Sequence, residues 1–146
     1  YDAAVEQVET ALVSGRALNK LAQMIQAHGG EPDVCQDTGR LPAASEIVTI
    51  PSGHTGFIKA FETDQIGTAA MLLGAGRRQK SDSIDPAVGI WMEVRLGKNV
   101  KKGDALARFH VNDKRYLDDA VQRFAGAVRI SENPVAVPPL IYTTVE

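Results

Sequence analysis

The 146 residues of this chain allow one ordinary domain with a hydrophobic core and a small helical appendage, but not two large domains. Hydrophobic residues make up 44% and charged residues 23% of the chain, and a net charge of −2 lacks the basic excess typical of nucleic-acid-binding proteins. The single cysteine, Cys35, excludes an internal disulfide, and no apolar run approaches the length of a membrane span. We therefore expect a cytoplasmic protein with neither a nucleic acid nor a membrane as partner.

Two apolar stripes at helical spacing open the chain, and a glycine follows each of them. The first stripe lies between Ala4 and Leu12 and stops before Gly15, and the second reaches Ile25 and stops before Gly29. This pattern predicts a pair of helices. Because the chain starts with tyrosine and the helical pattern is under way at once, we also expect it to be the C-terminal portion of a longer protein.

The period then changes from helical to alternating. Prolines, glycines and small polar residues over 31–45 favour an irregular connection with a boundary near residue 45. The alternation predicts strands over 47–50, 57–61, 90–96 and 105–111. A helix is expected from residue 63 to 73 and another from 117 to 128, and three prolines within 131–139 precede a final extended stretch, "LIYTTV".

Two short motifs indicate how these strands are arranged. The patterns G-F-I-x-x-F near residue 57 and V-x-x-G-x-x-V-x-x-G-D-x-L over 94–106 resemble the halves of the flattened barrel of biotinyl and lipoyl carrier domains. We expect an α+β fold with an N-terminal helical pair, a small mixed β barrel-sandwich of that type with a lid helix and loop, and a C-terminal helix. The expected segments are 1–45, a helical segment and connector; 46–130, a C-terminal α/β barrel-sandwich domain; and 131–146, an extended tail.

The stretch "LGAGRRQKSDSIDPAVGI" raises the possibility of a phosphate site. Its glycines follow a helix, where the helix dipole is negative, whereas phosphate loops use the positive helix start. The spacing also fits neither G-x-G-x-x-G nor G-x-x-x-x-G-K-[ST]. Arg77 and Arg78 are therefore explained as well by pairing with carbonyls at the helix end as by substrate binding.

The same stretch has the composition of a mobile lid, which we call the lid loop and place at residues 74–82. Two glycines at the beginning of the loop predict hinges. The basic side chains that follow them predict a role in closing a cleft. The predicted hinge residues are Gly74 and Gly76, and the predicted cleft-closing residues are Arg77, Arg78 and Lys80. The apolar residues expected to fix the far end of the loop are Ile84, Pro86 and Val88.

The remaining polar residues give weaker signals. His28, His54 and His110 show no metal-ligand spacing with one another or with Cys35, so we expect no metal and no cofactor. Asp85, just before a proline, is expected to bond local backbone N–H groups and shape a turn.

Lys114 supports an alternative function. Lipoyl domains carry their modified lysine in a tight hairpin after a turn like "VKKGD", and the segment "NDKR" at 112–115 occupies a comparable position. Arg115 and the helix that follows do not fit the carrier pattern, in which a small hydrophobic residue or methionines flank the lysine. A lipoyl- or biotinyl-type carrier modified at Lys114 stays open as the second reading.

Four stretches carry a stronger resemblance. In chain order, "SGRALNKLAQMIQAHGG", "GFIKAFETDQIGTAAMLLG", "GAGRRQKSDSIDPAVGI" and "LGKNVKKGDALARFHV" resemble the C-terminal portion of the pyrimidine nucleoside phosphorylase and thymidine phosphorylase family. The resemblance covers nearly all of residues 15–130.

The resemblance implies an enzyme that cleaves thymidine, deoxyuridine or uridine with inorganic phosphate, giving the base and a pentose 1-phosphate. It implies a homodimer whose subunits bind substrates between a helical and an α/β domain. The family's base-binding residues and phosphate loop lie upstream of the resemblance, so none maps onto this chain. The chain would then supply a cleft wall and the lid loop but no catalytic residue, and would be inactive without the missing N-terminal part.

Overall fold

The structure, a computed structural model, describes residues 1–143. The chain divides into two compact units, Tyr1–Pro42 and Ala43–Glu146. Among the described residues, no helix has both the length and the apolar character needed to cross a membrane.

The first unit contains the expected pair of helices, α1 (Asp2–Val13) and α2 (Arg16–Ala27). Gly15 and Gly29 end the two helices with φ angles of +75° and +78°, the left-handed conformation that glycine adopts without strain. None of residues 1–42 is buried, so the apolar stripes of both helices are at least partly exposed. The connector that follows contains two short 3₁₀ helices, η1 (Pro32–Cys35) and η2 (Thr38–Arg40).

The second unit contains two three-stranded antiparallel sheets. The first has the order β1 (Glu46–Pro51), β5 (Ala105–Val111), β3 (Gly89–Met92). The second has the order β4 (Asn99–Val100), β2 (Gly56–Phe61), β6 (Val128–Ser131). The α+β class is confirmed, but the expected mixed sheet is wrong. No hydrogen-bonded ladder joins the two sheets within residues 43–143, so a closed carrier-type barrel is not confirmed.

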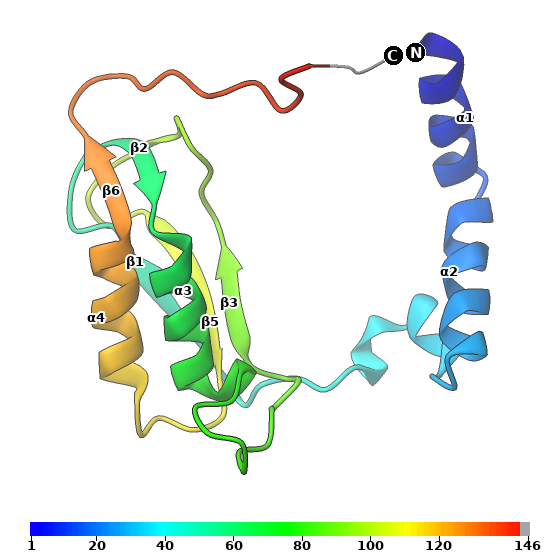
Figure 1. Cartoon of the computed structure of the whole chain (residues 1–146), viewed down its shortest axis with the longest axis horizontal. Coiled ribbons are helices and arrows are strands. Elements are labelled where there is room, and N and C mark those ends of the chain that lie inside the picture. Colours follow the sequence, from blue (N-terminus) through cyan, green and yellow to red (C-terminus); the bar gives the residue numbers. More distant parts are fainter. Residues whose placement is uncertain (144–146) are drawn as a thin grey trace. The chain divides into compact units, whose positions relative to one another are not determined.

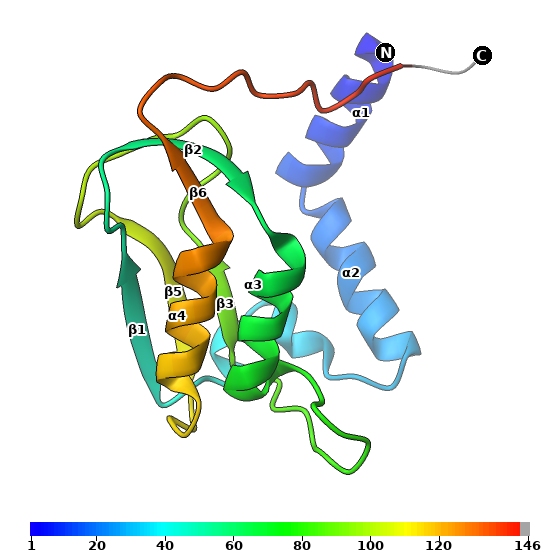
Figure 2. The same cartoon turned by 60° about the vertical axis from the view of Figure 1, so that its left-hand side comes forward.

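Two helices complete the core of the second unit. Helices α3 (Thr63–Ala70) and α4 (Leu117–Ala127) lie side by side (Figures 1 and 2), and the π-helical segment η3 (Met71–Ala75) continues α3. The core draws residues from both sheets and both helices. At its centre the rings of Phe109 and Phe124 meet edge to face, with 5.3 Å between their centroids, which fastens α4 to β5.

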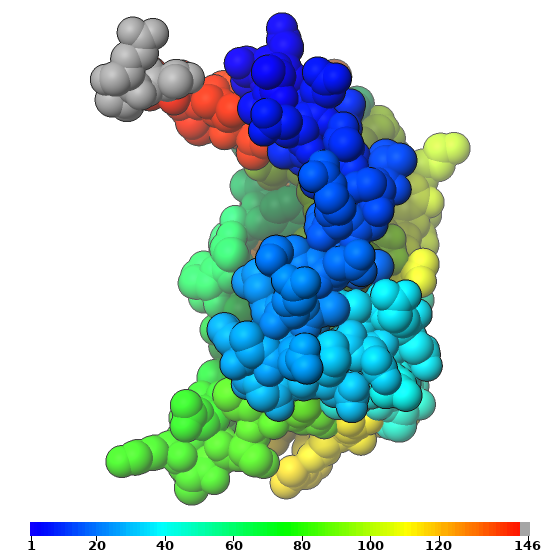
Figure 3. Space-filling model, turned by 90° about the vertical axis from the view of Figure 1, so that its right-hand side faces the viewer, coloured from blue at the N-terminus to red at the C-terminus, as the bar shows by residue number. Residues whose placement is uncertain are grey.

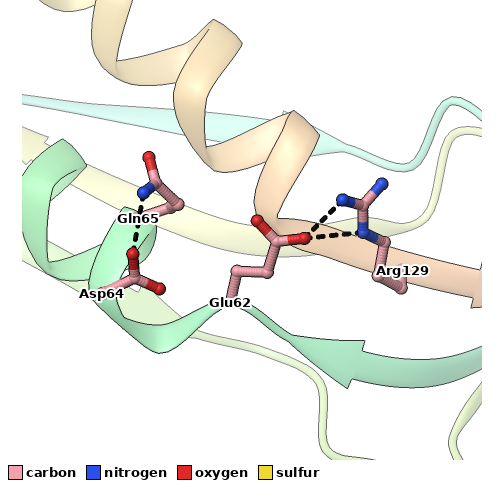
Figure 4. A network of polar contacts seen from close by, with 4 residues as sticks. All are labelled: Glu62, Asp64, Gln65 and Arg129. Carbon is pink, nitrogen blue, oxygen red and sulfur yellow. Dashed lines mark hydrogen bonds and ion pairs between the residues drawn. The ribbon is translucent and has the colours of Figure 1, made fainter.

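Strand β6 was not anticipated, because the sequence predicts helix as far as residue 128. Helix α4 ends at Ala127 and the chain continues into β6 without an intervening turn. Two contacts hold this junction against the start of α3. The N–H of Glu62 donates to the carbonyl of Ala127 at 2.9 Å, and the Glu62 carboxylate pairs with the guanidinium of Arg129 (Figure 4).

Two further segments differ in part from expectation. Strand β3 ends at Met92 rather than near residue 96, although Val94 still points into the core and is 1% exposed. Residues 134–143 form neither helix nor strand. Val137 packs against the backbone of Gly97, where a Cβ atom on residue 97 would lie only 2.4 Å from Cγ2 of Val137. The expected tail extends to residue 146, and residues 144–146 lie outside the described part of the chain.

Candidate functional site

The candidate site is built around the lid loop, which projects in green from its unit in the space-filling view (Figure 3). The loop leaves the π-helical segment η3, in which Gly74 has a φ of +105°. The backbone angles of Gly74 are not helical, so the helical path that begins with α3 ends at this residue. The other proposed hinge, Gly76, has an extended backbone with a φ of −156°, which any residue adopts.

Hydrogen bonds around Asp85 close the base of the loop. The N–H of Asp85 donates to the carbonyl of Gly74 at 3.0 Å, and the Asp85 carboxylate accepts the N–H of Ala87 at 2.9 Å. This confirms the expected turn-shaping role of Asp85. The other carboxylate oxygen accepts a hydrogen bond from Nδ2 of Asn112 at 2.7 Å. This bond links the loop to the connection between β5 and α4. Both hydrogen bonds stabilise the ionised carboxylate and so lower the pKa of Asp85, and the bond from the Asn112 amide has the larger effect.

The far end of the loop is therefore held mainly by polar contacts. Val88 is buried, as expected, but Ile84 is 52% exposed and Pro86 is also exposed. The expectation that all three anchor the loop through apolar contacts is wrong for these two residues. The reason is that the Asp85 hydrogen bonds turn the chain before it reaches the core at Val88.

The tip of the loop is ordered by a carboxylate within the loop itself. The Asp82 carboxylate accepts the N–H groups of Arg78 at 3.0 Å and Gln79 at 3.1 Å. These backbone hydrogen bonds lower the pKa of Asp82, and the bond from Gln79 has the largest effect. The side chains expected to close the cleft, Arg77, Arg78 and Lys80, are all exposed on this turn.

Arg78 lies over an aromatic ring that sequence reasoning did not identify. Its guanidinium carbon is 4.2 Å from the centroid of Tyr116, the residue just before α4. Beside it, Arg115 pairs with Asp113 at 2.6 Å, and this contact lowers the pKa of the Asp113 carboxyl. The hydrogen bonds of the described residues include none from Arg77 or Arg78 side chains to helix-end carbonyls. Arg78 stacks on the ring instead.

The lid loop and the residues that connect β5 to α4 enclose a depression of 790 Å³. Its lining mixes two arginines with three carboxylates and the phenol of Tyr116. The charged lining residues are Arg78, Arg115, Asp82, Asp85 and Asp113. Each carboxylate accepts hydrogen bonds that lower its pKa, so all three are ionised at neutral pH and none can act there as a proton donor. The depression therefore offers charged groups of both signs but no carboxylic acid that could donate a proton at neutral pH.

The structure also bears on two other kinds of site considered from the sequence, a metal site and a carrier lysine. Within residues 1–143, no cluster of three or more His, Cys, Asp or Glu side chains is arranged to hold a metal ion. Lys114 lies in the connection between β5 and α4, and its ammonium pairs with Glu46 at 2.5 Å. A carrier lysine requires the tip of a hairpin between two strands, and this segment leads into a helix instead. The carrier alternative is unsupported.

Comparison with known proteins gives one consistent result. The family described as "Pyrimidine nucleoside phosphorylase C-terminal domain" matches residues 57–131. A pyrimidine-nucleoside phosphorylase of Geobacillus stearothermophilus is 38% identical over 135 residues, which cover 92% of this chain and 31% of that protein. The corresponding protein of Bacillus subtilis is 34% identical over 144 residues, or 99% of this chain and 33% of the relative.

A pyrimidine-nucleoside phosphorylase of Staphylococcus epidermidis is also similar, with 33% identity over 141 residues, 97% of this chain and 32% of that protein. The chain thus spans about a third of the length of the curated relatives it matches. The matched family region begins at β2 and ends at β6, and it includes the lid loop, the Asp85 hydrogen bonds and Tyr116.

Proposed function

Because this chain belongs to the family of pyrimidine nucleoside phosphorylase C-terminal domains, we propose that it is the C-terminal part of a pyrimidine nucleoside phosphorylase. The observation that carries the proposal is the family match over 57–131 together with identity of 33 to 38% to relatives of that name along nearly the whole chain. The complete enzyme would transfer the pentose of thymidine, deoxyuridine or uridine to inorganic phosphate, and it would act as a homodimer.

Within that enzyme, residues 1–45 would form part of the larger α/β domain and residues 46–130 the C-terminal domain, with 131–146 as a tail. The second unit would contribute a wall of the substrate cleft, and the catalytic residues would come from the N-terminal part of the same protein. The expected cytoplasmic location stays a prediction.

The lid loop would close the cleft and bring positive charge toward the reacting groups. In phosphorolysis, phosphate attacks C1′ of the sugar while the base leaves as an anion, so charge develops at both ends of the reaction. Arg77, Arg78 and Lys80 lie on an exposed turn, and none of the ion pairs of the described residues includes them, so no carboxylate competes with a ligand for their charge. Added positive charge and the exclusion of water would stabilise that charge separation. Gly74 would serve as the hinge.

The proposal is tested with the complete enzyme and with this chain. Release of thymine or uracil from the nucleoside, with phosphate as the second substrate, should be seen with the complete enzyme and should be absent with residues 1–146. In the complete enzyme, Arg77→Ala with Arg78→Ala should lower kcat/KM. The matched control is Lys59→Ala with Lys102→Ala, which also removes two exposed positive charges but lies outside the lid loop, and it should leave kcat/KM unchanged. Turnover by the short chain, or unchanged kcat and phosphate KM in the double arginine variant, would contradict the proposal.

A further inference from the structure

Two segments that are far apart in the sequence meet at the depression, and their contacts differ in kind. At the base, Asp85 and Asn112 share a hydrogen bond of 2.7 Å. Nearer the tip, the guanidinium of Arg78 lies on the face of the Tyr116 ring at 4.2 Å. The first contact fixes the end of the loop, and the second holds one of the residues proposed to close the cleft.

The charges around Arg78 leave the aromatic ring as its main side-chain partner. The neighbouring carboxylate of Asp113 is occupied by Arg115, through Nη2 at 2.6 Å and Nε at 2.7 Å. The carboxylate of Asp82 is bonded to backbone N–H groups of the loop. Among the ion pairs of the described residues, none includes Arg78, so no carboxylate competes with an incoming anion for its guanidinium.

The Arg78–Tyr116 contact has a strength suited to a reversible latch. A cation over an exposed aromatic face is favoured by about two- to five-fold over the separated groups. Such a bias holds the side chain in place for most of the time and still lets a bound anion compete for it. The hinge needed for release lies a few residues away, at Gly74 in the π-helical segment.

We propose that Tyr116 is a positioning residue for the lid loop. Its ring holds Arg78 in a docked position, and the loop brings Arg78 to an anion in the cleft only after this contact breaks. The importance of the contact for phosphorolysis rests on the proposed function. The contact itself belongs to this chain and can be tested without any enzyme activity.

Trypsin provides a direct test, because Arg78 must leave the ring to enter the protease's specificity pocket. The initial rate of cleavage after Arg78, divided by that after Arg77 in the same loop, should rise about two- to five-fold in Tyr116→Leu. The matched variant Tyr116→Phe keeps the aromatic face and should keep the ratio of the unmodified chain. Dividing by Arg77 removes any change in overall unfolding. Equal ratios in all three proteins would overturn the proposal.

An NMR measurement on the unmodified chain keeps the proposal testable if Tyr116→Leu does not fold. Ring currents should shift the Cδ protons of Arg78 upfield relative to those of Arg77, and equal shifts for the two residues would overturn the docked position. In the complete enzyme, Tyr116→Leu but not Tyr116→Phe should change the KM for phosphate. If the protease and NMR results are as expected and this KM is unchanged, the contact stands and the lid function of the proposed enzyme fails.

Discussion

Gly74 and Gly76 stand two residues apart at the start of the lid loop and differ in what their backbones require. The φ of Gly74 is +105°, whereas Gly76 is extended and a Cβ there would lie 3.4 Å from Met71, an ordinary contact. We expect Gly74→Ala to lower the free energy of unfolding by about 1–3 kcal/mol, because the alanine must adopt a strained conformation. The matched change Gly76→Ala should stay within about 0.5 kcal/mol of the unmodified chain. Urea unfolding measures both, and equal effects would show that Gly74 is not the constrained position.

Asp85 makes the stability of the second unit depend on pH. Its bonds to Asn112 and Ala87 hold its native pKa below the ordinary aspartate value of about 3.9. A depressed pKa stabilises the folded state above the unfolded-state value, and this stabilisation is lost as the pH falls through the lower native pKa. The gap in urea midpoint between the unmodified chain and Asp85→Ala should therefore be widest near neutral pH and narrow below pH ~4. A gap that is constant from pH 7 to 2.5 would show that the ionised carboxylate is not what holds the turn.

At the scale of the element, Phe124 is the large side chain among the three buried residues of α4. Phe124 is fully buried and meets Phe109 of β5 edge to face. Phe124→Ala should lower the free energy of unfolding by about 3–5 kcal/mol, because it removes apolar contact area and leaves a cavity. The change to Ala at Asp118, an exposed residue of the same helix, provides the control and should have little effect. A small loss for Phe124→Ala in denaturant titrations would mean that α4 is fastened mainly elsewhere.

The elements that sequence reasoning identified are those with a clear period and a terminating residue. Both N-terminal helices end at the expected glycines, and β1, β2 and β5 lie where alternation predicts them. Strand β6 has four residues and follows α4 directly, so no turn residue marked its beginning. Pairing of the strands depends on contacts across the chain, which periodicity does not report. The carrier-type barrel was inferred from turn motifs, and those motifs say nothing about which strands share a sheet.

In the candidate site, too, the local contacts were predictable from the sequence and the long-range contacts were not. The role of Asp85 was predicted because an aspartate before proline bonds its own turn, a local property. Asn112 and Tyr116 were missed, since they reach the loop from a segment more than 25 residues further along the chain. A tyrosine before a helix carries no local signal of an arginine partner. The functions of Arg77, Arg78, Lys80 and the two hinge glycines stay predictions.

At the scale of the whole molecule, the two units differ in how they are stabilised. The hydrophobic core consists of residues of the second unit, and none of residues 1–42 is buried. Isolated helices of about 12 residues are marginal in water. Residues 43–146 should therefore unfold at nearly the same urea midpoint as the whole chain, while a peptide of residues 1–42 should show little helical circular dichroism. A marked drop in midpoint after removal of residues 1–42 would contradict this division.

The direct passage from α4 into β6 has a consequence for how related chains can vary in length. Side chains of a strand alternate between faces, so one residue added between Ala127 and Val128 would turn Val128 outward and Arg129 toward the core. It would also shift the arginine away from Glu62. Alignments of homologues should accordingly run without gaps through this point. Insertions and deletions should collect instead between Gly76 and Asp82, where the hydrogen bonds of the backbone stay within the loop.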